Sequence, residues 1–379
     1  MINVFQPTLG EDELAEVRAV FESSWLGRGP RTRVFEQAFS AHIGANPDQV
    51  KAVNSCTEGL FLAMELLDVG AGCDVVLPAI SFVGAANAIA ARGGRPIFCD
   101  VDPRSLNPTA DHVAEKLTPC TRAVVLLHYG GAPGQVAEIA KLCRDRGIAL
   151  VEDAACAVAS AVDGRACGTF GDIGVWSFDS MKILVTGDGG MLYCRNPELA
   201  HLAASRSYLG MDSASGAAQV AARDRWWEFD VLSYSRRSIL NDVAAAIGCV
   251  QLNRLADFIA RRNAIARRYD EALGQLPQLC CPPALPAGHV SSHQFYWIQM
   301  RPEIRDVIAR QLHDHGVYTT FRYFPLHWLP IYRAGAHLPG AEQAASRTLC
   351  IPMHQGLDDN AVETVIAEVT QAVAAVSRR

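Results

Sequence analysis

Short apolar runs alternate with helical patterns along the first half of this 379-residue chain. The runs read as strands, because they are short, rich in Val, Ile and Leu, and bounded by polar turns. They are QVKAVNS, DVVLPA, RPIFCDV, RAVVLLHY and IALVEDAA, followed by GDIGVWSF and GGMLYCRN. Strands that are almost entirely apolar are buried on both faces. The alternation therefore predicts an α/β fold with a mostly parallel central sheet covered by helices on both sides.

The pattern changes in the last third of the chain. The segment NDVAAAIGCVQLNRLADFIARRNAIARRYDEALGQL reads as one long helix or two abutting ones. A smaller α+β unit follows, with strands expected over HQFYWIQM and VYTTFRYF and a C-terminal helix near 358–377. We therefore expect a large domain over 1–250 and a small C-terminal domain over 251–379.

Composition excludes several classes of protein. The 34 Lys and Arg against 40 Asp and Glu give a formal net charge of -6, without the basic stripe that nucleic acid or an anionic membrane would require. No apolar stretch reaches the roughly 20 residues of a membrane helix, and no export signal begins the chain, so a cytoplasmic location is expected. The twelve cysteines include no C-x-x-C pair. Free buried thiols are expected, and no metal site.

Polar segments stand at or just after the ends of the predicted strands, which is the edge where open α/β sheets bind ligands. The turn 54–59, NSCTEG, can present free backbone N–H groups to a phosphate, although Ser or Thr at such a turn more often only caps the helix. Asp153 closes the strand IALVED. An acidic strand end can bind a metal, orient a base or pair with a protonated ring nitrogen, and is as often merely structural.

Lys182 lies between SFDSM and the Gly-rich turn GDGG. Most lysines are solvated, but one held in an apolar pocket can form a Schiff base, and glycines beside it would let the backbone approach a flat cofactor. Phe82 could stack on a planar ring, although Phe more often belongs to a core. A phosphate turn, a strand-end Asp and a lysine in a Gly-rich turn, in this order, together predict a pyridoxal 5'-phosphate (PLP) site.

These segments resemble the DegT/DnrJ/StrS family of PLP-dependent aminotransferases, which mostly aminate keto groups of nucleotide-linked sugars. The resemblance runs nearly end to end, and it rests on VNSCTEGLFLAMELL, LPAISFVGAANAI, VEDAA, SFDSMKILVTGDGG, AAAIGCVQL, RYFPLH and LPGAEQAASRTLCIPMH. It implies the fold-type I architecture of PLP-dependent transferases, PLP as cofactor, and a homodimer whose subunits share their active sites.

The resemblance also implies roles for individual residues. Lys182 would be the Schiff-base lysine and would carry protons during the reaction. Asp153 would pair with the ring nitrogen, and Phe82 would stack on the ring. The cofactor phosphate would be held by Cys56, Thr57 and Ser177.

Three positions depart from the family's usual pattern. Cys156 stands where Gln or His usually touches the phenolic oxygen of the cofactor, and a thiol is a poorer donor. Asp179 stands where His is frequent. Arg237 falls where an Asn from the neighbouring subunit commonly reaches the phosphate, a contact that arginine can also make.

The resemblance implies that the chain transfers an amino group, usually from L-glutamate, to a keto sugar. The substrate that the resemblance favours is a nucleotide-linked 4-keto-6-deoxyhexose. The reaction would belong to amino-sugar biosynthesis for a polysaccharide or an antibiotic. Two alternatives remain. A PLP-dependent sugar dehydratase of the same family typically has His in place of Lys182. A non-enzymatic PLP-binding regulator would be expected to contain a basic helix-turn-helix segment, and none is evident.

Overall fold

A seven-stranded sheet forms the centre of the computed structural model, which describes residues 1–211, 225, 227–332 and 334–377. Its strand order is β1-β9-β8-β5-β4-β2-β3. The strands are β1 (Val50–Val53), β2 (Asp74–Pro78), β3 (Arg95–Cys99), β4 (Thr121–Leu127), β5 (Ala149–Asp153), β8 (Ile173–Ser177) and β9 (Gly190–Cys194). Strands β3, β2, β4, β5 and β8 run parallel, and β9 is antiparallel to both β8 and β1. The mostly parallel sheet is therefore confirmed.

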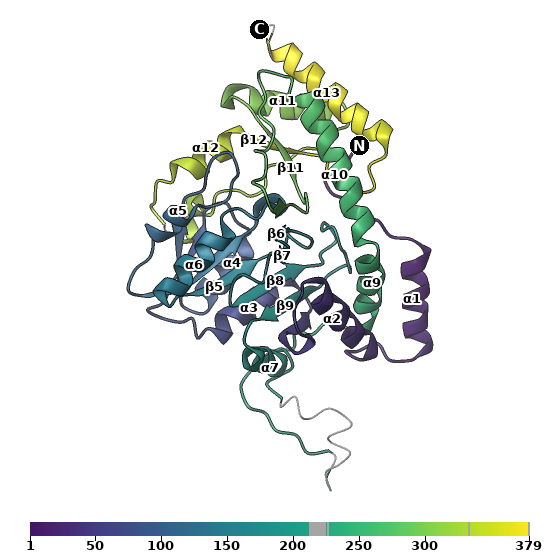
Figure 1. Ribbon diagram of the computed structural model, residues 1–379, viewed down its shortest axis with the longest axis vertical. Coiled ribbons are helices and arrows are strands. Elements are labelled where there is room, and N and C mark those ends of the chain that lie inside the picture. Colours follow the sequence, from purple (N-terminus) through teal and green to yellow (C-terminus); the bar gives the residue numbers. More distant parts are fainter. Residues whose placement is uncertain (212–224, 226, 333, 378–379) are drawn as a thin grey trace.

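Helices cover both faces of this sheet, as the apolar strands predict (Figure 1). One face is covered by α3 (Cys56–Leu66), α4 (Val83–Ala91) and α7 (Pro197–Arg206). The other face is covered by α2 (Pro30–His42), α5 (Ala110–Ala114), α6 (Val136–Arg146) and α9 (Asp242–Asn253). Helix α1 (Glu11–Glu22) packs outside, against α9.

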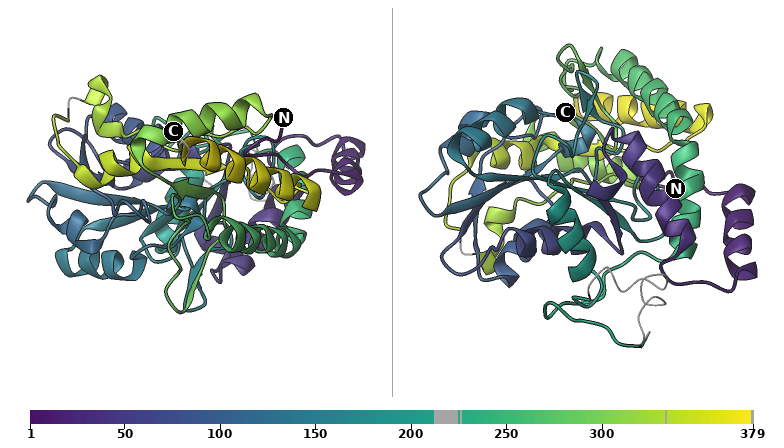
Figure 2. Two further views of the ribbon diagram at one scale, coloured as in Figure 1. Left: turned by 90° about the horizontal axis from the view of Figure 1, so that it is seen from above. Right: turned by 60° about the horizontal axis from the view of Figure 1, so that its bottom comes forward.

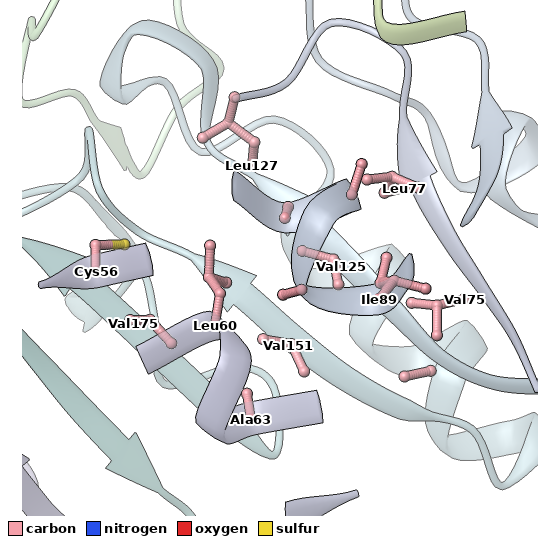
Figure 3. Close-up of a cluster of buried hydrophobic side chains, with 14 of the residues drawn as sticks. Cys56, Leu60, Ala63, Val75, Leu77, Ile89, Val125, Leu127, Val151 and Val175 are labelled. Atoms are coloured by element: carbon pink, nitrogen blue, oxygen red, sulfur yellow. The ribbon is translucent and has the colours of Figure 1, made fainter. Parts of the chain in front are cut away.

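Strand side chains alternate between the two faces of the sheet, and two valines on one face show how α3 packs against it. Figure 3 shows Val151 and Val175 of neighbouring strands pointing toward Leu60 and Ala63 of α3. The helix approaches closely because residue 59 is glycine: a Cβ there would lie 2.5 Å from Val175 Cγ1. The start of α3 is thereby held directly over the carboxyl ends of the strands.

The C-terminal unit begins with a bend between two helices. Helix α9 and α10 (Leu255–Leu273) meet at Arg254 with an angle of 57°, so the long helical segment is two helices. By length and composition this bent pair could span a membrane, whereas no single helix among the described residues could. Figure 1 shows α10 rising from α9 toward the second unit.

The second unit contains a two-stranded antiparallel sheet, and an apolar core forms where α10, α11 and α13 meet, whereas α12 packs against the core of the central sheet. Helices α11 and α13 lie side by side (Figure 2, left). The elements are β11 (Tyr296–Gln299), α11 (Pro302–Asp314), α12 (Pro339–Arg347), β12 (Thr348–Ile351) and α13 (Asp359–Ser377). Three short strands, β6 (Ala161–Val162), β7 (Arg165–Ala166) and β10 (His289–Val290), form a separate sheet.

One strand prediction is wrong. The segment VYTTFRYF forms only isolated bridges, from Val317 to Ile2 and from Thr320 to Cys350. The partner of β11 is β12, which the sequence did not indicate. After Thr320 the chain leaves β12 and crosses to the large unit, where the Leu326 N–H donates to the Ala79 carbonyl at 2.8 Å.

The boundary near residue 250 stays a prediction, but a helix break and the contacts of the N-terminal residues bear on where the units join. Helix continuity breaks at Arg254. The first residues of the chain attach to the C-terminal unit: the Ile2 N–H donates to Gly316 at 2.7 Å, and the Met353 N–H donates to Val4 at 3.1 Å. The N-terminus accordingly lies beside α10 and α13 in Figure 1.

Candidate active site

A cavity of about 310 Å³ lies at the carboxyl edge of the central sheet. Its walls come from the loops after several strands and from one segment of the C-terminal unit. Six of the eight residues predicted for the site line it: Cys56, Thr57, Phe82, Asp153, Ser177 and Lys182. The remaining two, Cys156 and Arg237, lie outside its lining.

Asp153 ends β5 and is 1% exposed. Its Oδ1 accepts a hydrogen bond from the Ala155 N–H at 3.1 Å, and the Cys56 thiol lies 3.9 Å away. Burial raises the pKa of this carboxyl, while the Ala155 N–H and the charge of Lys182 oppose the rise. A buried carboxylate of this kind is stabilised by a cationic partner within the cavity.

The preceding acid, Glu152, serves a different purpose, because successive side chains of a strand point to opposite faces. Its carboxylate accepts from the N–H groups of Gly168 at 2.7 Å and Gly171 at 2.5 Å. It also pairs with His128 Nε2 at 2.9 Å, with both side chains fully buried. Glu152 thus holds the loop that leads into β8, and Asp153 alone faces the cavity.

Helix α3 presents its N-terminus to the cavity. The Ser55 side chain caps the helix by accepting from the Glu58 N–H at 3.1 Å. The N–H groups of Cys56 and Thr57, in the first turn, have no partner within the helix and are available to an anion. Gly190 permits this arrangement, because a Cβ there would lie 2.8 Å from the Cys56 nitrogen. This glycine therefore serves the packing of β9 against α3, which differs from the expected approach to a flat cofactor.

Lys182 sits in a tight turn that Asp179 organises. The Asp179 carboxylate accepts from the Met181 N–H at 2.9 Å, and its carbonyl accepts from the Lys182 N–H at 2.9 Å. Gly187, with φ 91°, lets the chain turn back toward β9. Asp179 replaces the histidine that is frequent in the family with a residue that shapes the lysine turn.

Cys156 stands beside the lysine although it does not line the cavity. Its Sγ lies 3.9 Å from Lys182 Nζ and 4.0 Å from the Tyr323 hydroxyl. Burial raises the pKa of this thiol, so it is neutral near pH 7. The rings of Tyr323 and Phe82 lie 5.8 Å apart, which places the tyrosine on the same side as the predicted stacking residue.

The sequence analysis missed the two lining residues that come from the C-terminal unit. Arg322 and Tyr323 reach the cavity from the C-terminal unit. The segment RYFPLH indicated the family. Because it lies far along the chain from the predicted strand ends, nothing in the sequence indicated that it closes the cavity. The one local feature that sets the pair apart is its place between two phenylalanines, just before Pro325.

Arg237 does not line the cavity of its own subunit. It is exposed, and its guanidinium lies over the Tyr208 ring at 5.5 Å. The neighbouring Arg236 pairs with Glu58 at 2.6 Å and Glu65 at 3.6 Å. A contact of Arg237 with cofactor phosphate would require a second subunit, and this role stays a prediction.

The residues present fit PLP. The cavity offers free N–H groups and the Ser177 hydroxyl at one end for a phosphate, a buried carboxylate for a ring nitrogen, and a lysine. A larger cavity of about 910 Å³ lies between the two units and shares no lining residue with this one. Among the described residues that line it there is no lysine or arginine, so it is not suited to a phosphate-bearing cofactor. The fold and the site define a fold-type I PLP-dependent transferase.

Comparisons with known proteins specify the family. Residues 7–370 match the model of the DegT/DnrJ/EryC1/StrS aminotransferase family. A dTDP-4-dehydro-2,3,6-trideoxy-D-glucose 4-aminotransferase of Saccharopolyspora spinosa is 56% identical, over 98% of this chain and 97% of the relative.

Solved structures agree with this match. The aminotransferase TlmJ from Streptoalloteichus hindustanus is 64% identical with a TM-score of 0.95, covering 99% of this chain and 100% of that one. The sugar aminotransferase CalS13 from Micromonospora echinospora is 30% identical with a TM-score of 0.89, covering 98% and 100%. The chain belongs to the DegT/DnrJ/EryC1/StrS aminotransferase family. The expected enzyme class, a PLP-dependent aminotransferase, is confirmed.

The position of Lys182 in the cavity predicts where the cofactor is attached. The chain has four lysines, at 51, 116, 141 and 182, and of these only Lys182 lines the cavity. Borohydride reduction of the PLP-loaded protein should therefore fix the cofactor on the peptide that contains residue 182, as read by mass spectrometry. Lys182→Ala should lose both this label and transamination, while Lys141→Ala, an exposed control, should retain both. A label on any other lysine would contradict the assignment.

Proposed function

We propose that the enzyme transfers the amino group of L-glutamate to C4 of a dTDP-linked 4-keto-6-deoxy sugar, in the biosynthesis of an amino sugar for an antibiotic or polysaccharide. The observation that supports this most is the relative that is 56% identical over nearly the whole chain and is named for such a reaction on a trideoxy sugar. The cavity agrees with it, because the lysine and acid that transamination requires both line its wall.

Different residues would hold different parts of the cofactor. When bound, PLP supplies an electron sink that stabilises negative charge on the carbon next to the transferred nitrogen. The buried carboxylate of Asp153 would keep the ring nitrogen protonated through a charge pair. The first turn of α3 and the Ser177 hydroxyl would hold the phosphate and so fix the ring in register with Asp153.

Lys182 would act twice. Its amine first holds the cofactor, and once the donor's amine has displaced it, the same group is free to move a proton as general base and then general acid. The nearby thiol of Cys156, neutral because burial raises its pKa, can contact the lysine nitrogen without competing for its proton. The short turn around Asp179 limits how far the side chain can move from the cavity.

The dehydratase alternative has less support. Enzymes of that kind typically have His at the lysine position, and here Lys182 lines the cavity. No observation favours a PLP-binding regulator. A protein that only bound PLP would not need both Lys182 and Asp153 in the cavity.

One assay tests the proposed function against the dehydratase. Purified enzyme, PLP and L-glutamate labelled with nitrogen-15 are incubated with 4-keto-6-deoxy sugars linked to dTDP, GDP or UDP. We expect a dTDP-linked product that contains the heavy nitrogen in place of the keto oxygen, identified by mass spectrometry. A product that has lost a hydroxyl group but contains no label would instead indicate dehydration. No labelled product from any sugar of the panel would refute the proposal.

The enzyme is further proposed to be a homodimer with two shared sites. Large apolar side chains are exposed in the segment that precedes Arg237, namely Phe229, Val231, Leu232 and Tyr234, and exposed apolar side chains are what a subunit interface would cover. Arg237 of one subunit would then contact the phosphate bound by the other.

Mixing two inactive variants tests this arrangement. Lys182→Ala and Arg237→Ala homodimers should each have little activity. After subunit exchange, one of the two sites in a heterodimer contains both residues, so part of the activity should return. Arg236→Ala, whose side chain pairs with Glu58 on the same subunit, is the matched control for loss of a neighbouring charge. If subunit exchange is demonstrated and the mixture still has no activity, a shared site that contains Arg237 is excluded.

We also propose a cytoplasmic location. All twelve cysteines are free, and seven of them are buried, which agrees with a reducing compartment.

A further inference from the structure

Two glutamine side chains of the C-terminal unit bind the backbone on either side of Lys182. The Gln294 side-chain N–H donates to the Met181 carbonyl at 2.9 Å, and the Gln355 side-chain N–H donates to the Ile183 carbonyl at 3.2 Å. Both glutamines are buried, with exposed fractions of 1% and 9%. The lysine turn of the large unit is therefore anchored by the other unit at the residues before and after the lysine.

These anchors complete the hydrogen bonding of the turn. Asp179 accepts from the N–H groups of Met181 and Lys182 within the turn itself. An ionised carboxylate cannot donate, so the carbonyl groups of the turn depend on donors from elsewhere. Ser180 and Met181 are exposed, so apolar packing contributes little to holding this part of the turn.

One buried arginine holds both glutamine segments. Arg262 of α10 is 1% exposed, and its Nε donates to the Gln355 side-chain oxygen at 2.9 Å. Its Nη1 donates to the carbonyls of His293 at 2.8 Å and Met353 at 3.1 Å. The first of these residues directly precedes Gln294, and the second lies two residues before Gln355. Because a guanidinium presents its donors in one rigid plane, these bonds fix the two segments relative to each other.

The same arginine determines the orientation of the Gln355 amide. An arginine can only donate, so the amide oxygen must face Arg262 and the amide nitrogen must face Ile183. Burial lowers the pKa of Arg262 to about 9, and the guanidinium therefore stays charged near pH 7. Hydrogen bonds from a charged donor are stronger than neutral ones, so the amide is held in the orientation that binds the lysine turn.

We propose that Gln294 and Gln355 are positioning residues for Lys182, which fix the backbone on both sides of the lysine so that its amine reaches the carbon from which a proton is taken. The inference rests on the proposed role of Lys182 as the group that moves this proton. Proton transfer requires the two heavy atoms to lie within hydrogen-bond reach, and a misplacement of about 1 Å can slow a reaction by roughly 100-fold.

Gln355→Glu separates positioning from folding stability. A carboxylate can still bind Arg262, now as an ion pair, but it has no N–H for the Ile183 carbonyl. The midpoint of thermal unfolding should therefore change little. The conversion of bound PLP by saturating L-glutamate should slow roughly 10-fold, while the glutamate concentration for half-maximal rate stays within about twofold.

A second variant and a control accompany it. Gln294→Met keeps the size of the side chain without its donor, and it should slow the conversion by a similar factor. Gln299→Met is the matched control. Gln299 is also buried in the C-terminal unit and donates to a carbonyl of the large unit, that of Pro103 at 2.6 Å, but this contact lies at the β3 edge of the central sheet. Since Gln355→Glu keeps the bond to Arg262, it provides the test even if Gln294→Met does not fold.

Two further measurements examine the lysine turn itself. With L-glutamate deuterated at its α-carbon, the slowed conversions should show a deuterium isotope effect, because proton transfer is the step that has become slower. In the protein without PLP, amide hydrogen exchange over residues 179–186 should be faster in both variants and unchanged in Gln299→Met.

Four results would overturn the inference: unslowed conversion in the glutamine variants, equal slowing in Gln299→Met, slowed conversion without an isotope effect, or unchanged hydrogen exchange of the turn. Failure of the proposed function gives a different result. If the unsubstituted enzyme aminates no sugar, but Gln355→Glu still slows the conversion of PLP by L-glutamate as expected, the proposed function fails while this inference stands.

Discussion

The burial of one carboxylate, that of Asp153, is the constraint on which the site depends. Asp153 ends a central parallel strand, is almost inaccessible to solvent, and has a raised pKa because it is desolvated. A group in this state is stabilised when a cation faces it. Lys182 supplies part of that charge, and a protonated cofactor ring would supply the rest. The direction of the strand therefore determines where the cofactor ring must lie.

The elements around Asp153 keep that position rigid. Glu152, on the opposite face of the strand, binds two backbone N–H groups of the 168–171 loop and so fixes the start of β8. At its other end, β8 presents Ser177 to the cavity. Gly59 and Gly190 let α3 settle against β8 and β9, which brings its free N–H groups to the same edge. Asp153, the N-terminus of α3 and the turn that contains Lys182 are thus aligned by apolar packing and by backbone contacts.

The sequence predicted most of the large unit and most of the site, because both follow from local patterns. Apolar strands ending in polar turns pointed to the turn 54–59 and to Asp153, and a Gly-rich turn pointed to Lys182, whereas Cys56 and Ser177 were named through the family resemblance. Arg322 and Tyr323 could not be placed in this way. They reach the cavity only because the chain leaves β12 after Thr320 and crosses between units, a long-range event with no periodic signature. The same crossing explains why VYTTFRYF, strand-like in composition, does not form a strand.

The most direct test of this account is the protonation state of the bound cofactor's ring nitrogen. PLP labelled with nitrogen-15 in the ring would be bound to the enzyme and to Asp153→Asn, and examined by NMR near pH 7. We predict a protonated nitrogen in the unsubstituted enzyme, its loss in the variant, and at least a tenfold slower proton transfer, about 1.4 kcal/mol of barrier. An unprotonated nitrogen in the unsubstituted enzyme, or a smaller loss of rate, would contradict the role given to Asp153.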